Sequence, residues 1–251
     1  MISGFDAGVL VAAGALAGLV GTAGGITSLV SYPALLAVGL TPLSASVTNI
    51  VALVACWPGS ALASRPELGG TGPWFRRWAP VAVAGGLVGS GLLLSTSAGA
   101  FSEIVPYLVL AAALSLLAQP RFTAWQERRG YVSGRLVLGC GLFMSSAYNG
   151  YFGAGSGIMV LALLLLSVER DTARANALKN MLVGVATVLS AFTLVAFGHV
   201  EWIAAGALGL GAFLGATIGP VVARRIPGDV LRWLASLAGI ALALRLWIAP
   251  L

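Results

Sequence analysis

Long apolar stretches, separated by short polar connections, run through nearly the whole of this chain. Only 9% of its 251 residues are charged, whereas about 25% are charged in a typical soluble domain. A helix needs roughly 20 apolar residues to cross the hydrocarbon core of a bilayer, which is about 30 Å thick. The sequence therefore predicts an all-α integral membrane protein that crosses the lipid bilayer several times. The apolar stretches lie at 5–38, 44–63, 78–97, 101–118, 135–167, 175–197, 201–222 and 229–248.

The stretches 5–38 and 135–167 are too long for one ordinary crossing, and each carries a glycine cluster near its middle. The first cluster reads Gly21-Thr22-Ala23-Gly24-Gly25-Ile26, and the second reads Gly153-Ala154-Gly155-Ser156-Gly157-Ile158. Each cluster would interrupt a helix. The first stretch lacks the basic start of a secretory signal peptide, so we expect it to belong to the mature bundle.

Further features follow both clusters in the same order. Asn49 matches Asn180 in the next stretch, and a Gly-x-x-x-Gly pattern comes later in each half, at Gly85/Gly89 and at Gly211/Gly215. We interpret these later glycines as helix-packing positions, because small residues let two helices approach closely. The recurring order predicts two membrane repeats joined by a cytoplasmic linker. Their bounds are 1–118 for the first repeat, 119–134 for the linker and 135–251 for the second repeat.

Arginine clusters mark some of the connections between the stretches. Basic connections usually stay in the cytoplasm. The stretch 135–167 must then begin and end on the cytoplasmic face, which makes it a hairpin. The repeat predicts that 5–38 is also a hairpin, entering from outside. The halves become inverted repeats, each a broken helical hairpin plus three transmembrane helices, a plan that recurs in secondary transporters. The predicted inside connections are 64–77, 119–134, 167–174 and 223–232, and the outside ones are 39–43, 95–100 and 198–201.

A glycine break inside lipid must be covered, because each unsatisfied backbone group there costs several kcal/mol. Interrupted segments at matching places in two repeats are the best sequence indication of a transporter's binding site. The second arm of each hairpin is predicted to start near Gly25 and Gly157. A helix start presents unpaired N–H groups and about half a positive charge. Two starts that meet at the midplane would bind a small anion; the alternative is that these glycines only allow tight packing.

Polar side chains surround the predicted breaks, among them Thr27, Ser28 and Asn149. Lys179 lies about two turns into its stretch. It either snorkels to the cytoplasmic face or places a fixed positive charge on an anion path. The predicted substrate site comprises Thr22, Gly24, Gly25, Thr48, Asn49, Gly153, Gly155, Ser156, Gly157, Lys179 and Asn180.

Few residues are suited to catalysis or metal binding. The chain has one histidine, His199, so it offers few side chains that could act as the general base beside a nucleophile. We therefore do not expect an enzyme. Cys56 and Cys140 lie inside apolar stretches, where a free cysteine acts as a small hydrophobe. No metal-binding spacing is present, and no cofactor is expected. The net charge of +6 comes from arginines between stretches, which indicates orientation in the membrane and not a nucleic-acid partner.

Two further roles are predicted to be structural. Trp57 and other tryptophans lie near the ends of stretches, where indoles prefer the membrane interface, so we interpret them as anchors. Asp171 or Thr172 is predicted to cap the helix that follows it.

Both glycine clusters and their surroundings resemble the sulfite exporter TauE/SafE family, over nearly the whole chain. The resemblance rests on the first cluster with Pro33 downstream, and on the second cluster followed by Ala177-Leu178-Lys179-Asn180. It implies a multi-pass protein of the bacterial cytoplasmic membrane that moves small sulfur-containing anions. Ala23 and Ser156 stand where the family often has glycine, which leaves the identity of the anion open. The family's motif positions carry over onto Gly21, Gly24, Gly25, Gly153, Gly155 and Gly157, and onto Thr48, Asn49, Lys179 and Asn180.

We therefore expect a transporter of a small sulfur-containing anion such as sulfite or an organosulfonate, and we expect it to work as an exporter. Alternating access around a midplane site is the expected mechanism. The alternatives are an anion channel built around the same site and a membrane subunit that scaffolds a partner without transporting anything. The expected partners are the small anionic substrate and the lipid bilayer, and the sequence leaves the oligomeric state open.

Overall fold

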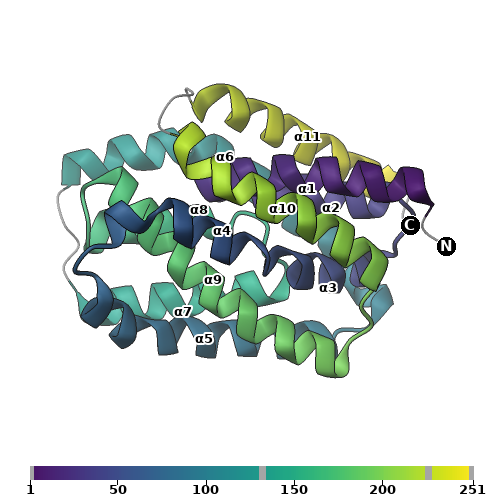
Figure 1. The fold of residues 1–251 in the computed structure, drawn as a ribbon, viewed down its shortest axis with the longest axis horizontal. Coiled ribbons are helices and arrows are strands. Elements are labelled where there is room, and N and C mark those ends of the chain that lie inside the picture. The colour runs from purple at the N-terminus through teal and green to yellow at the C-terminus, as the bar shows by residue number, and fades with distance from the viewer. Residues whose placement is uncertain (1–2, 130–133, 224–227, 249–251) are drawn as a thin grey trace.

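The structure is a computed structural model that describes residues 3–129, 134–223 and 228–248. Every regular element within these ranges is a helix, which confirms the predicted all-α class. Six helical segments in the described part are long and apolar enough to cross a membrane. They run broadly along one direction (Figure 1). The elements are α1 (Gly4–Gly24), α2 (Thr27–Ala37), α3 (Pro42–Leu53), α4 (Cys56–Ala63), the 3-10 helix η1 (Arg65–Leu68), α5 (Gly72–Ser95), α6 (Ala98–Arg129), α7 (Arg135–Tyr151), α8 (Ser156–Ser167), α9 (Thr172–Phe197), α10 (Trp202–Ala223) and α11 (Gly228–Ile248).

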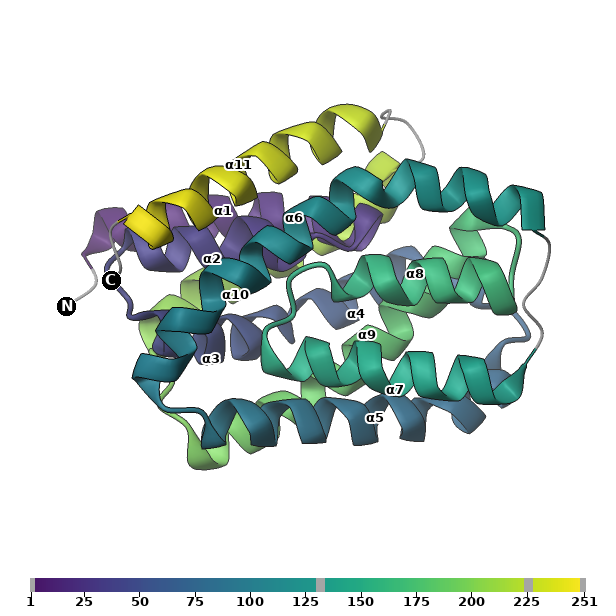
Figure 2. The same cartoon turned by 180° about the vertical axis from the view of Figure 1, so that it is seen from behind.

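Both long stretches are broken at their glycine clusters, as predicted. Gly25 ends α1 in the left-handed conformation, with φ +79°, and its N–H donates to the Gly21 carbonyl over 2.6 Å. Gly153 and Gly155 have positive φ angles as well, and they carry the chain from α7 into α8. Figure 2 shows α7 and α8 folding back on each other around this turn. Each long stretch is therefore two helices packed side by side, since α1 contacts α2 and α7 contacts α8.

Glycines bring the first arm of each hairpin close to a helix of the other half. The α1 helix packs on α10, where a Cβ added at Gly211 or Gly215 would overlap the α1 backbone. Similarly, α7 packs on α5, where a Cβ added at Gly85 or Gly89 would overlap the α7 backbone. These contacts confirm that the later Gly-x-x-x-Gly patterns serve helix packing. The first helix of each half therefore packs on a helix of the other half.

The α5–α7 contact gives a direct test of this packing. Gly89→Ala is expected to lower the thermal midpoint in detergent, because the new methyl would overlap the Ala147 carbonyl and lie 2.9 Å from the Tyr151 nitrogen. Overpacking of this kind costs about 1–3 kcal/mol. The matched control is Gly91→Ala on the same helix, where a Cβ meets nothing within 4 Å. Gly91→Ala should be neutral or slightly stabilising, and equal losses for both variants would contradict the proposed role of Gly89.

The stretch 44–63 lies in one candidate membrane span, Pro42–Ala63, whose regular helical bonding is interrupted between α3 and α4. Pro58 explains the break, because proline has no N–H to give to the carbonyl four residues earlier. That carbonyl, of Val54, instead accepts from the Trp57 N–H over 3.1 Å. The 3-10-type bonding tightens the chain at this point. A third interruption therefore lies among the helices, beside the two glycine breaks.

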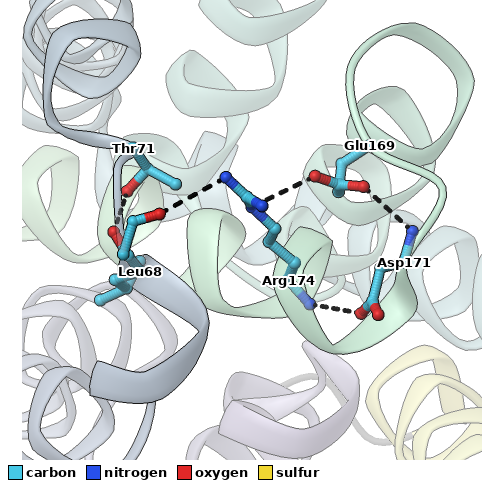
Figure 3. A network of polar contacts seen from close by, with 6 residues as sticks. Leu68, Thr71, Glu169, Asp171 and Arg174 are labelled. Carbon is cyan, nitrogen blue, oxygen red and sulfur yellow. Dashed lines mark hydrogen bonds and ion pairs between the residues drawn. The ribbon is translucent and has the colours of Figure 1, made fainter.

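Two connections meet at one end of the bundle through the polar network in Figure 3. Arg174 pairs with Glu169, with Nε 3.2 Å from Oε2, and donates to the Gly69 carbonyl over 3.5 Å. The Asp171 carboxylate accepts from the Arg174 N–H over 2.9 Å and caps α9, which confirms the predicted N-cap. The connection after η1 and the connection before α9 therefore lie at the same end, as their common predicted side requires.

The predicted linker 119–134 is helical over most of its length, because α6 continues to Arg129. Residues 130–133 lie outside the described part of the structure. The polar composition of this region indicated a connection, but a polar helix end that leaves the membrane has the same composition.

Candidate functional site

The two glycine breaks meet in the middle of the molecule. A Cβ added at Gly25 would lie 2.6 Å from the Gly157 carbonyl carbon, and one added at Gly157 would lie 2.6 Å from the Gly25 Cα. Real Cβ atoms do not approach a backbone so closely, so only glycine at both positions allows this contact. Ser28 extends the junction, because its hydroxyl oxygen lies 3.2 Å from where a Gly153 Cβ would sit. The hairpin tips therefore touch through bare backbone.

A cavity of about 70 Å³ lies beside this junction. On this measure roughly 10–15 Å³ holds one water molecule, so the cavity has room for a solute of only a few heavy atoms. Both hairpins, the α3–α4 break and α9 contribute to its wall. Among the described residues, no aspartate or glutamate is part of the lining. The lining comprises Gly21, Thr22, Gly25, Thr27, Ser28, Ile50, Leu53, Cys56, Trp57, Ser60, Asn149, Gly153, Ser156, Gly157, Lys179, Asn180, Val183, Gly184 and Thr187.

One face of α9 forms a continuous side of the cavity. Its members recur at the helical spacing of three to four residues, as one face of an α-helix requires. The basic end of this face is Lys179, the only lysine in the sequence, and its side chain is buried, with 2% exposure. The face comprises Lys179, Asn180, Val183, Gly184 and Thr187.

The Lys179 ammonium lies against the carbonyl end of α1. Its Nζ is 3.4 Å from the Gly21 oxygen and 3.5 Å from the Thr22 oxygen. Two amides share the Thr22 oxygen, at 2.9 Å from Asn176 Nδ2 and 3.2 Å from Asn180 Nδ2. The ammonium carries three protons, but among the described residues only the Gly21 and Thr22 oxygens accept from it, and the Thr22 oxygen already serves two amides. This side of the cavity therefore has more donors than acceptors.

The second hairpin is held by a chain of side-chain hydrogen bonds. Asn149, near the end of α7, donates to the Thr187 hydroxyl over 2.9 Å. Its oxygen accepts from the Ser156 hydroxyl over 2.8 Å, and that hydroxyl also lies 2.9 Å from the Gly153 carbonyl. The amide thus ties the end of α7 to the start of α8 and to α9. This network fixes the position of the α8 N-terminus at the cavity.

The first hairpin is braced from behind by Asn49. Its Nδ2 donates to the Ser28 hydroxyl over 3.1 Å, and its Oδ1 accepts from Ser31 over 2.6 Å. Within the described residues, the Ser28 hydroxyl has no acceptor of its own, so its hydrogen is available inside the cavity. Asn49 is fully buried and positions Ser28, but it does not line the cavity itself.

The structure brings most of the predicted site residues together, and it puts the others elsewhere. Thr48 points away, because its hydroxyl accepts from the Glu201 N–H over 3.2 Å at the connection before α10. Gly155 precedes α8 and lies against Ala112 of α6. Gly24 is the last residue of α1, and its surroundings lie outside what the structure describes. The residues that do line the cavity are Thr22, Gly25, Gly153, Ser156, Gly157, Lys179 and Asn180.

Several cavity residues were not among the predicted ones. Thr187 and Gly184 could have been found from the helical period that starts at Lys179. Trp57, expected to anchor the membrane interface, instead lines the cavity with its indole nitrogen buried. The signal for this placement was Pro58, which ends the regular bonding of α3 just before the tryptophan. Within the described residues, no cluster of three or more histidine, cysteine, aspartate or glutamate side chains is present.

Known proteins resemble this chain along most of its length. The sequence profile of the family described as "Sulfite exporter TauE/SafE" matches residues 7–246. A protein of Escherichia coli strain K12 named "Probable membrane transporter protein YfcA" is 27% identical over 233 residues, which cover 87% of this chain and 81% of the relative. A Sinorhizobium protein named "Probable membrane transporter protein ORF9" is 26% identical over 244 residues, covering 96% and 92%. No solved structure gives a significant match.

These matches agree with the six apolar helices in the described residues and with the expectation of a transporter that is not an enzyme. The profile covers both glycine breaks and every residue that lines the cavity. This multi-pass membrane transporter therefore belongs to the sulfite exporter TauE/SafE family.

Proposed function

We propose that this chain exports a small sulfur-containing oxyanion, such as sulfite or an organosulfonate, across the bacterial cytoplasmic membrane. The observation that carries the proposal is Lys179, a buried cation in the wall of a small cavity that no described carboxylate lines. A buried charge is costly unless it is paired. An anion bound in the cavity would supply the missing counter-charge. The family supports a sulfur oxyanion as that ligand.

The polarity of the surrounding helix ends supports an anion as well. The carbonyl end of α1 carries partial negative charge, but Asn176, Lys179 and Asn180 already donate to it. The starts of α2 and α8, which carry partial positive charge, remain beside the cavity at Thr27 and Ser156. The net balance at this place is positive. Backbone N–H groups and the hydroxyls nearby would donate to the anion's oxygens.

We further propose that the halves are inverted repeats and that they rock against each other around a cavity at the bilayer midplane. The exchange of helices supports this relation, since α1 of the first half packs on α10 and α7 of the second half packs on α5. Glycines leave few side chains between the helices of these pairs, so the helices could slide along each other as the halves move. The arginine-rich connections would lie in the cytoplasm.

Binding and flux of anions would test the proposed function. The purified protein should bind sulfite or a sulfonate in calorimetry, and in liposomes it should carry that anion with saturable flux and counter-transport. A panel of sulfite, thiosulfate, methanesulfonate and acetate would define the class of substrate. Flux without saturation or counter-transport would indicate a channel. Absence of both binding and flux with every anion would contradict the proposal and favour a scaffolding subunit.

The proposed orientation has its own test. Leu40→Cys and Arg170→Cys, each in a background with Cys56 and Cys140 replaced by alanine, would be labelled in intact cells with a membrane-impermeant thiol reagent. Position 40 should react from outside and position 170 only after the membrane is opened. The reverse pattern would overturn the proposed orientation.

A further inference from the structure

Trp57 presents a hydrogen-bond donor that nothing in the described structure satisfies. Its indole lines the cavity, and its Nε1 is buried without any hydrogen-bond partner among the described residues. The indole N–H can only donate. A buried donor without a partner loses the water it would have bonded, so such groups are rare in folded proteins. Because Trp57 is part of the cavity lining, an anion bound in the cavity would bring an acceptor next to this side chain.

The backbone of α9 holds this indole in place. A Cβ added at Gly184 would lie 2.5 Å from the Trp57 Cγ and 2.7 Å from its Nε1, so the ring rests directly on the glycine. Gly184 lies five residues beyond Lys179, which is about 7.5 Å along the helix axis. The Trp57 indole of α4 therefore packs on the face of α9 that carries Lys179, but at a different height along the helix.

We infer that Trp57 donates its indole N–H to the bound anion and is a specificity-determining residue of the cavity. This inference rests on the proposed function and names a further contact in the same site. Trp57 approaches from α4, Lys179 from α9, and Ser28 from α2 with its unused hydroxyl hydrogen. Three donors from three helices match a head group with three oxygens, such as sulfite or a sulfonate. A carboxylate presents its two oxygens in one plane, so three donors that converge from three helices fit it less closely.

Trp57→Phe tests the contact, because it keeps an aromatic ring and removes the N–H. We expect the Kd for sulfite or methanesulfonate, measured by calorimetry, to rise at least about tenfold, since a hydrogen bond to a charged group is lost. The Kd for acetate should rise less, so the preference for sulfonate over acetate should shrink. The matched control is Trp202→Phe, an exposed tryptophan outside the cavity lining, which should leave both values unchanged. Equal affinities in Trp57→Phe and wild type would overturn the inference.

A second measurement uses the wild-type protein, so that the inference stays testable if the variant does not fold. With ¹⁵N-labelled tryptophan, a saturating concentration of sulfite should move one indole N–H resonance strongly downfield. Gly184→Ala, whose new methyl would displace the ring, should remove that shift and weaken binding. If sulfite binds and no indole resonance moves, the role of Trp57 is wrong while the proposed function stands. If no anion binds at all, the proposed function itself has failed.

Discussion

Gly25→Ala is expected to destabilise the protein strongly and to abolish anion binding. An L-residue in the left-handed conformation costs about 1–2 kcal/mol, and Gly25 has φ +79°. The new methyl would also lie 2.6 Å from the Gly157 carbonyl carbon and 2.8 Å from the Ile158 nitrogen. These are backbone atoms, which cannot rotate away, so overpacking adds about 1–3 kcal/mol. Thermal unfolding in detergent and calorimetry with sulfite measure the two effects.

Gly39→Ala is the matched control for this substitution. Gly39 also has a positive φ, +90°, but a Cβ there meets nothing within 4 Å. It therefore separates backbone strain from the contact between the hairpin tips. We expect a modest loss of stability and unchanged affinity for the anion. If both variants lost the same stability and kept the same affinity, the meeting of the tips would have no part in forming the site.

Lys179→Met is expected to weaken anion binding at least about 100-fold and to leave the fold intact. The substitution removes a charge at contact distance, which is worth about 4 kcal/mol at an effective dielectric constant near 20. Replacing a buried ionic group by a well-packed apolar one is often neutral or stabilising. The Thr22 carbonyl keeps its bonds from Asn176 and Asn180, so the end of α1 stays capped. Calorimetry and the thermal midpoint in detergent report on the two expectations.

Arg174→Met provides a control with the same loss of charge on the same helix. Arg174 lies outside the cavity lining and pairs with Glu169 at the end of the bundle. It should leave the affinity unchanged. Because the chain has a single lysine, protein labelled with ¹³C-lysine shows one side-chain signal, which should move when sulfite binds. A wild-type signal that stays in place at saturating sulfite, with unchanged affinity in Lys179→Met, would remove Lys179 from the site.

The two hairpins and their meeting point could be predicted from glycines that stand out within apolar stretches of the sequence. Gly25, Gly153 and Gly155 stand in apolar surroundings where a helix would otherwise continue, and each has a positive φ in the structure. Their interruption of the helices was therefore predictable. The contact between Gly25 and Gly157 was an inference from repeat order, and it holds because the absent side chains let the two backbones touch.

Other parts of the site could not be read from the sequence, because helix facing depends on tertiary packing. Thr48 and Asn49 are neighbours, but successive residues of a helix point about 100° apart. Asn49 therefore turns toward Ser28, while Thr48 turns toward the connection at Glu201. Trp57 lies in an apolar stretch, and apolar neighbours are equally typical of a tryptophan at the membrane interface and of one that lines a cavity. Only the α3–α4 break, with Pro58 as its cause, distinguishes the two.

The crowded oxygen of Thr22 has a consequence for the resting protein. Two amide groups share this oxygen with the Lys179 ammonium. The ammonium has three protons, and among the described residues only the Gly21 and Thr22 oxygens accept from it, so one proton is left over. Hydrocarbon offers no hydrogen-bond acceptor for this proton, so we expect water to reach the cavity whenever no anion is bound. An empty cavity would therefore contain water, and each binding event would replace those water molecules by the oxygens of the anion.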